Sequence, residues 1–133
     1  MTDGDRPDDA PRASGGDLDR ALRTAEELEL TTAGRRTRRP HTVTLWFAYD
    51  GEEVWLRADA GADWLRNLDR DASCHVRVSG IERAATREPV ADEAAALRRL
   101  VELWRAKYGQ EWVADWYVER GRVPVRLRIE PRR

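Results

Sequence analysis

The segment from Leu30 to Arg39 joins a short run of strand-forming residues to a glycine and four arginines. Thr31 and Thr32 favour a pleated, half-buried backbone, and Gly34 permits a positive φ that other residues resist. This pattern predicts a strand that ends in a tight loop. Guanidinium groups hold phosphate and carboxylate with paired donors, so the loop is a candidate anion site, with a solvated hairpin end as the alternative.

The residues after this loop predict a second hairpin. An extended run from His41 to Tyr49 is followed by Asp50-Gly51, which is the strongest short hairpin signal, and the returning strand runs from Glu53 to Arg57. The next segment, from Ala58 to Ala62, reads as a turn. This part of the chain is therefore expected to be mainly β.

Three more strands are predicted further along the chain, which brings the total to about six. Apolar and polar residues alternate strictly from Ser73 to Ser79, and a partner strand with weaker alternation follows from Ile81 to Val90, ended by Pro89. The last strand runs from Val123 to Ile129.

Apolar residues at helical spacing predict four helices. The first three follow aspartate caps at Asp17, Asp63 and Asp92, and the fourth lies between Gly109 and Gly121. Aromatic residues four positions apart, which we place on one face of the fourth helix, are Tyr108, Trp112 and Trp116. The chain therefore has an α+β, mainly β, character.

The length of 133 residues suits one domain. Charged residues make up 37% of the chain, but the net charge is only −1, which gives no bulk electrostatic case for binding nucleic acid or a membrane. Residues 1–30 hold nine acidic residues and four arginines, whereas residues 31–40 hold four arginines and no acid. Only the second segment has the charge of an anion site.

Several classes of site have no support in the sequence. Cys74 is the single cysteine, which excludes an intrachain disulfide and a zinc site built from several thiolates. The two histidines lie far apart, so no metal is expected. No apolar run approaches the ~20 residues of a membrane span, and the start does not have the pattern of a signal peptide, so we expect a cytoplasmic protein. The single lysine, Lys107, is interpreted as compositional bias.

Several spaced motifs together resemble the deazaflavin-dependent nitroreductase family. They lie between about Glu27 and Pro131, and they are Leu30-Thr-Thr-Ala-Gly-Arg-Arg-Thr, Pro40, Leu45-Trp-Phe, Asp50-Gly51, Trp64-Leu-Arg-Asn-Leu68 and Val123-Pro-Val-Arg-Leu. The resemblance implies a split β-barrel with flanking helices, related to the FMN-binding barrels of pyridoxamine phosphate oxidases. We expect residues 17–133 to form this single domain and residues 1–16 to form a disordered acidic tail.

The resemblance also implies a cofactor and its binding residues. Coenzyme F-420 is a deazaflavin whose tail carries a phosphate and glutamates, and Arg35 and Arg36 match the basic pair that holds that tail. Arg38 stands where many relatives have glycine. The full set of expected cofactor-binding residues is Arg35, Arg36, Thr37, His41, Arg57, Ala58, Asp59, Trp64 and Asn67. The segment from Arg57 to Gly61 replaces a Ser-Lys pair of many relatives with Asp59-Ala60, which removes a hydroxyl and a positive charge.

The implied activity is hydride transfer between reduced F-420 and a small organic acceptor such as a quinone or a nitro compound. Tyr108 is the candidate catalytic residue, as a proton donor or a group that positions the acceptor, and the candidate substrate residues are Trp46, Trp112 and Trp116. Two alternatives stay open: an FMN-dependent reductase on the same fold, and a non-catalytic carrier of a flavin, a deazaflavin or a tetrapyrrole. The expected assembly is a monomer or a homodimer.

Overall fold

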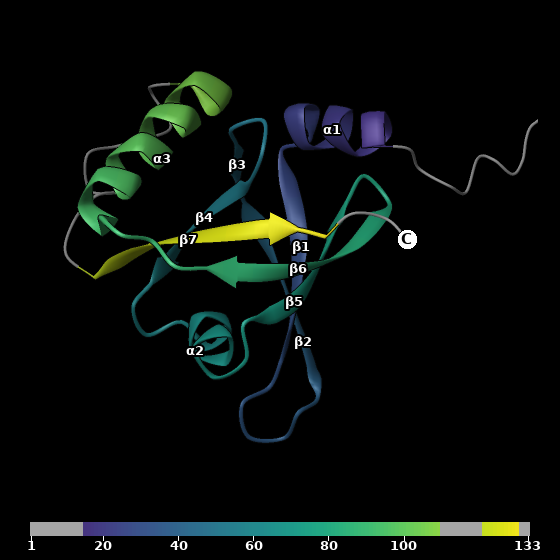
Figure 1. The fold of residues 1–133 in the computed structure, drawn as a ribbon, viewed down its shortest axis with the longest axis vertical. Coiled ribbons are helices and arrows are strands. Elements are labelled where there is room, and N and C mark those ends of the chain that lie inside the picture. Colours follow the sequence, from purple (N-terminus) through teal and green to yellow (C-terminus); the bar gives the residue numbers. More distant parts are fainter. Residues whose placement is uncertain (1–14, 110–120, 131–133) are drawn as a thin grey trace, which may run out of the picture.

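The computed structural model describes residues 15–109 and 121–130, which form seven strands and three helices (Figure 1). The strands are β1 (Glu27–Ala33), β2 (Pro40–Trp46), β3 (Ala48–Tyr49), β4 (Val54–Asp59), β5 (Ser73–Val78), β6 (Ile81–Glu88) and β7 (Arg122–Ile129). The helices are α1 (Gly15–Thr24), α2 (Asp63–Arg70) and α3 (Glu93–Tyr108).

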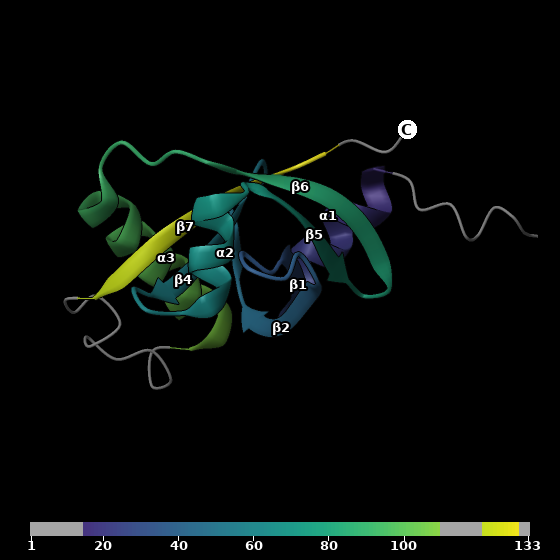
Figure 2. The same ribbon diagram turned by 90° about the horizontal axis from the view of Figure 1, so that it is seen from below.

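All strands pair antiparallel in one sheet with the order β2-β1-β5-β6-β7-β4-β3. β2 and β3 lie at opposite edges of this order, yet Phe47 alone separates them in the chain. The sheet must therefore curl until its two edges approach each other, and Figure 2 shows this curl from below. The result is a curled half-barrel, which confirms the predicted mainly-β, split-barrel fold class.

Alternating side chains fill the interior of the curled sheet. Leu28 and Leu30 of β1 and Leu56 of β4 are fully buried there. α1 and α2 lie at opposite ends of the barrel in Figure 1, and Leu22 and Leu65 join the same core from these two helices. The helices therefore close both ends of the interior and bury its apolar surface.

α3 covers the outer face of β3, β4 and β7. Its buried residues Leu97, Leu100, Val101 and Trp104 form a second apolar cluster with Ala48 of β3. The predicted cap of this helix is confirmed, because the side chain of Asp92 accepts a hydrogen bond from the backbone N of Ala95 at 3.1 Å.

The run from His41 to Tyr49, predicted as one strand, is divided at Phe47, so the described chain has seven strands where six were expected. The side chain of Phe47 is completely buried. Before it, β2 pairs with β1, and after it, β3 pairs with β4. The chain thus changes its strand partner at this buried residue, and alternation alone does not reveal such a change.

The starts of two helices differ from the prediction. α1 begins at Gly15, so Asp17 lies in its first turn and Gly15-Gly16, expected in the tail, are helical. Asp63 is the first residue of α2, and the cap position belongs to Ala62, which makes no side-chain hydrogen bond there. Asp63 instead pairs with Arg35, at 3.2 Å between Oδ1 and Nη2. A carboxylate in the first turn still favours the helix.

Two other expectations are corrected near the ends of elements. Ala58 and Asp59 were expected in a turn but belong to β4, where they pair with β7, and the turn starts at Ala60. Tyr108 was placed on a fourth helix but is the last residue of α3, which ends where Gly109 has a φ of 98°. The expected fourth helix, between Gly109 and Gly121, falls mostly outside the described residues.

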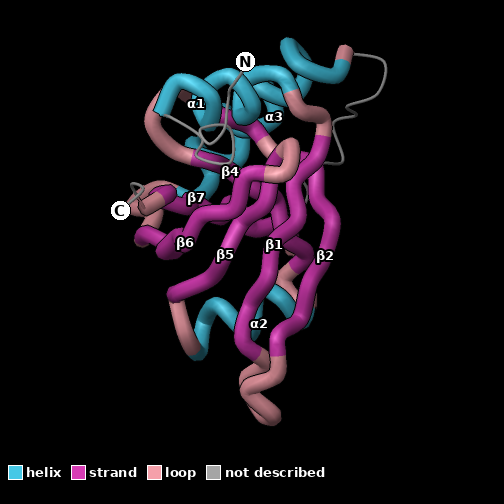
Figure 3. Tube along the Cα trace, turned by 90° about the vertical axis from the view of Figure 1, so that its right-hand side faces the viewer, coloured by secondary structure: helices cyan, strands magenta, loops and turns pink. Residues whose placement is uncertain are grey.

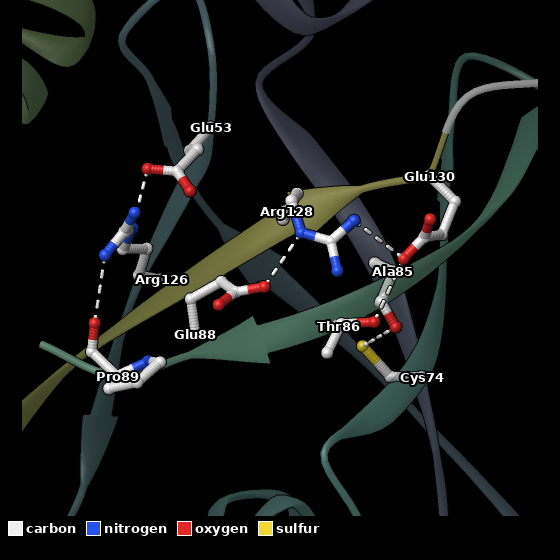
Figure 4. Close-up of polar contacts among 9 residues, drawn as sticks. All are labelled: Glu53, Cys74, Ala85, Thr86, Glu88, Pro89, Arg126, Arg128 and Glu130. Carbon is white, nitrogen blue, oxygen red and sulfur yellow. Dashed lines mark hydrogen bonds and ion pairs between the residues drawn. The ribbon is translucent and has the colours of Figure 1, made fainter.

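Ion pairs on the outer face of β7 occupy two of its three arginines, Arg126 and Arg128 (Figure 4). Arg126 Nε lies 2.7 Å from Glu53 Oε1. Arg128 Nε lies 2.8 Å from Glu88 Oε2, and its Nη1 lies 3.0 Å from Glu130 Oε2. These carboxylates tie β7 to β6 and to the turn before β4, so both guanidinium groups already have anionic partners.

The split between the sheet edges leaves backbone groups without strand partners. β3 pairs with β4 only at Val54 and Trp55, so within the described chain the rest of β4 pairs on one side alone, with β7. β2 likewise pairs only with β1. The unpaired backbone N–H and C=O groups of these strand edges are available to bind another molecule.

Candidate functional site

The loop between β1 and β2 is held as a compact turn by its own backbone. Gly34 N donates to the carbonyl of Arg39 at 2.8 Å, and Arg38 N donates to the carbonyl of Gly34 at 2.8 Å. Thr37 Oγ1 accepts a hydrogen bond from Arg39 N at 3.2 Å. Four arginines are thereby fixed at the tip of one hairpin, as predicted for this segment.

The residue with positive φ in this loop is Arg38, at 65°, and the expected positive φ of Gly34 is wrong. Gly34 is needed for space instead, because an added Cβ would lie 3.1 Å from Thr37 Oγ1 and 3.2 Å from the carbonyl oxygen of Arg39. Glycine adopts this left-handed backbone with less strain than arginine does. Arg38 retains the bend and pairs with Asp71 at 3.0 Å.

A buried amide on α2 positions the first arginine of the loop. Asn67 is 3% exposed, and its Oδ1 accepts hydrogen bonds from both the backbone N and the Nη1 of Arg35, each at 3.1 Å. Its Nδ2 donates to Thr32 Oγ1 of β1 at 3.0 Å. All of the polar atoms of this buried amide thus have partners, which is what its burial between apolar neighbours requires.

A cavity of about 360 Å³ opens between this loop and α2. Several positively charged side chains line it. The lining residues are Gly34, Arg35, Arg36, Thr37, Arg39, Pro40, His41, Asp63 and Asn67. Figure 3 shows the hairpin loop and α2 at the same end of the molecule. Within the described ranges, the side chains of Arg36 and Arg39 make no ion pair or hydrogen bond, unlike those on β7. Both are therefore available to an anion.

Five of the predicted cofactor-binding residues meet at this cavity, namely Arg35, Arg36, Thr37, His41 and Asn67. Sequence reasoning missed Asp63 as a member of the site. The signal was present, because Asp63 and Asn67 are four residues apart on one helix and such residues share a face. Arg39, to which no role was assigned, also lines the cavity.

The expected cofactor residues on β4 lie outside this cavity. Ala58 is buried in the barrel interior. Arg57 Nη1 lies 3.5 Å from Asp59 Oδ1, and the Arg57 guanidinium sits 5.7 Å from the ring centre of Trp104. Asp59 also pairs with Arg122 of β7 at 3.0 Å. The side chains of this strand end are therefore engaged with one another and with α3.

Trp64 is part of the apolar core beneath α2 and is 7% exposed. It does not line the arginine-rich cavity, although it is on the same short helix as Asn67. Of these two predicted cofactor-binding residues on α2, only Asn67 therefore lines the cavity.

Tyr108 and Trp46 belong to an aromatic cluster on the outer side of the sheet. Their rings stack with centroids 4.0 Å apart, and Trp104 contacts Trp46 edge-on at 5.7 Å. The Tyr108 hydroxyl donates to the carbonyl of Glu26 and accepts from Phe47 N at 3.3 Å. Burial is the main cause that raises the pKa of Tyr108 to about 12.

The structure does not bring Tyr108 together with Arg35. The hydroxyl of Tyr108 binds the residue just before β1, whereas Arg35 lies just beyond the other end of that strand. β1 has seven residues, so the two ends are about 20 Å apart at the usual rise of a strand. Figure 1 shows α1 and α3 at the end opposite to α2.

Lys107 lies beside the same aromatic cluster. Its Nζ donates to the carbonyl of Phe47 at 3.0 Å and lies 3.4 Å from the centre of the Phe47 ring. Burial lowers the pKa of Lys107 to about 8. The single lysine of the chain therefore titrates closer to neutrality than a solvated lysine, a property that composition did not reveal.

Two of the expected substrate residues, Trp112 and Trp116, lie outside the described residues. In the described ranges, no group of three or more His, Cys, Asp or Glu side chains is arranged to hold a metal ion. No helix in the same ranges is long and apolar enough to cross a membrane.

The fold is a split β-barrel, and an arginine-lined cavity lies at the loop of its β1–β2 hairpin. The family model of the F420H(2)-dependent quinone reductases matches residues 6–129. The chain therefore belongs to this family, which confirms the predicted deazaflavin-dependent relationship. A comparison with curated proteins found no match.

Solved structures share the fold at low sequence identity. An F420 reductase has a TM-score of 0.67 and 18% identity, over 84% of this chain and 92% of that chain. A Listeria innocua protein named as a pyridoxamine 5'-phosphate oxidase has a TM-score of 0.66 and 15% identity, over 86% and 92%. The heme storage protein HutZ from Vibrio cholerae has a TM-score of 0.70 and 14% identity, over 89% and 91%. These likenesses show the fold alone.

Proposed function

We propose that this protein is an oxidoreductase that binds coenzyme F-420 and transfers a hydride between that coenzyme and a small organic acceptor. The observation that carries the proposal is the cavity at the hairpin loop, where Arg35 is fixed by Asn67 and where Arg36 and Arg39 have no carboxylate partner among the described residues. Membership of the F420H(2)-dependent quinone reductase family supports both the cofactor and a quinone as the acceptor.

The chemistry of this cavity fits the anionic tail of F-420. Its lining contains three arginines and only one carboxylate, that of Asp63. Guanidinium groups bind phosphate and carboxylate oxygens with paired donors, and His41 adds a ring nitrogen at the same opening. We therefore assign the phosphate and the start of the glutamate tail to Arg36 and Arg39, beside the fixed Arg35.

The ring site that we propose is the unpaired edge of β4. Within the described chain, Leu56 to Asp59 pair only with β7, so alternate backbone groups of this segment lack a strand partner on the other side. The predicted cofactor contact of Arg57, Ala58 and Asp59 is kept here, through the backbone of a strand edge in place of a turn. When bound, the deazaflavin supplies the carbon that carries the hydride, while the protein orients the reactants and excludes water.

The contacts of Tyr108 favour a packing role over the predicted proton transfer. Its hydroxyl is held by the backbone of Glu26 and Phe47, and its pKa is raised to about 12 by burial. A donor useful at neutral pH has a pKa near that pH. We propose that water supplies the proton that the reduced acceptor takes up.

Titration of the purified protein with F-420 and separately with FMN, followed by ligand fluorescence, tests the cofactor. The proposal predicts saturable binding of F-420 that is tighter than binding of FMN. Binding of FMN alone would replace the proposal with the FMN-dependent alternative. Binding of neither ligand would contradict an assignment to either flavin class.

A turnover assay with reduced F-420 and a soluble naphthoquinone separates an enzyme from a carrier. The proposal predicts oxidation of the reduced coenzyme that depends on both protein and quinone. Tight F-420 binding without turnover would favour the carrier. A parallel titration with heme tests the alternative that the protein carries a tetrapyrrole.

A further inference from the structure

The guanidinium of Arg35 is already engaged by two side chains of α2. Its Nη2 lies 3.2 Å from Asp63 Oδ1, and its Nη1 lies 3.1 Å from Asn67 Oδ1. Asp63 and Asn67 are one helical turn apart, so both face the loop. An anion that enters the cavity therefore meets Arg36 and Arg39 first, and it must displace Asp63 or lie beside it to reach Arg35.

The carboxylate of Asp63 repels the phosphates of the two candidate cofactors to different degrees. FMN ends in a phosphate monoester, which carries a charge of about −1.5 to −2 at pH 7. The phosphate of F-420 is a diester and carries one negative charge, and the carboxylates of its tail are separate groups that can each contact another arginine. Repulsion by Asp63 is therefore larger for the compact dianion than for the diester.

We propose that Asp63 is a specificity-determining residue that disfavours phosphate monoesters and thereby selects F-420 over FMN. This inference rests on the proposed function, because it assigns the cofactor phosphate to the cavity at the hairpin loop. Selection by a repulsive group is a common source of specificity. The side chain is 68% exposed at the cavity lining, so it meets an incoming ligand directly.

The test is the Asp63→Asn variant, titrated with F-420, FMN and riboflavin at low salt. The amide keeps the size of the side chain and can still accept a bond from Arg35, so only the charge is removed. We expect FMN to bind about two- to five-fold more tightly and F-420 less than about two-fold more tightly, as an exposed charge allows. Riboflavin has no phosphate, so its affinity should stay unchanged, and the gain for FMN should shrink as salt rises.

Asp69→Asn is the matched control, because Asp69 is also on α2, is 61% exposed and pairs with Arg87 at 2.6 Å outside the cavity. It should leave all three affinities unchanged. Equal gains for FMN and riboflavin in Asp63→Asn, or an unchanged ratio of the F-420 and FMN affinities, would overturn the inference. Failure of the parent protein to bind F-420 would instead contradict the proposed function, and the FMN and riboflavin comparison could still be made.

Discussion

Asn67 Oδ1 accepts hydrogen bonds from both the backbone N and the guanidinium of Arg35. One buried oxygen on α2 therefore fixes where the hairpin loop begins and where its first arginine points. Because two N–H donors converge on this atom, it must be the amide oxygen, and the amide nitrogen then faces Thr32 Oγ1. The candidate anion site thus depends on a contact between α2 and the β1–β2 hairpin.

Replacement of Asn67 by alanine should weaken both the fold and the site. The change leaves the backbone N of Arg35 and the hydroxyl of Thr32 without their partner, which costs about 1–3 kcal/mol of the free energy of unfolding. Urea denaturation measures that loss, and F-420 titration should show weaker binding. Thr32→Val is the control, since it loses the contact to Asn67 Nδ2 but keeps both bonds to Arg35, so it should lower stability with little change in affinity.

Replacement of Arg38 by glycine should be better tolerated than replacement by alanine. Both changes remove the exposed ion pair with Asp71, but only glycine relieves the backbone at a φ of 65°. Left-handed backbone costs other residues about 1–2 kcal/mol, partly offset by the entropy of glycine in the unfolded chain. Arg38→Gly should therefore be more stable than Arg38→Ala by about 1 kcal/mol in urea denaturation. Equal stabilities would show that this bend carries no strain.

Replacement of Tyr108 by phenylalanine distinguishes packing from catalysis. The backbone N of Phe47 and the carbonyl of Glu26 both lose the hydroxyl, so the free energy of unfolding should fall by about 1–2 kcal/mol. Stacking on Trp46 is kept. Turnover with a naphthoquinone should change less than about three-fold, whereas loss of a general acid costs about 100-fold or more. A loss of that size would restore the predicted catalytic role.

The titration of Lys107 should be visible in the pH dependence of stability. Burial lowers its pKa in the folded state from 10.5 to about 8, so above pH 8 the unfolded chain binds more protons than the native one. Stability from this group therefore rises with pH between about 8 and 10.5. Cys74, whose pKa burial raises to about 12, acts in the opposite direction above about pH 9.

Comparison with Lys107→Met isolates this effect, because both proteins contain Cys74 and the same tyrosines. The free energy of unfolding of the parent should rise relative to that of the variant between pH 7 and about pH 9. A constant difference across this range would show that the ammonium of Lys107 is solvated in the folded protein.

Much of the fold could be predicted from the sequence because its strands alternate and its turns carry strong local signals. The alternation of β5 and the turn at Asp50-Gly51 both appear as expected, and Asp50 accepts backbone hydrogen bonds from Glu52 and Glu53. The break at Phe47 could not be predicted, because it arises where the curled sheet exchanges one strand partner for another. That is a long-range property.

In the candidate site, too, local features could be predicted from the sequence and long-range contacts could not. The basic loop is local in sequence, so Arg35 and Arg36 could be identified directly. Asp63 was read as a helix cap, because capping is a local rule, whereas its contact with Arg35 joins residues 28 positions apart. Tyr108 was grouped with later aromatic residues by spacing alone, but the end of α3 at Gly109 places it with Trp46.

The most direct test of the anion site is F-420 binding by the Arg36→Ala, Arg39→Ala double variant, measured across a range of salt concentrations. The matched control is Arg98→Ala, Arg99→Ala on the exposed face of α3, which removes the same charge away from the cavity. We predict that the loop variant loses at least about ten-fold in affinity and most of the salt dependence, with stability close to that of the parent. Parent-like affinity and salt dependence in the loop variant, or an equal loss in the control, would contradict the account.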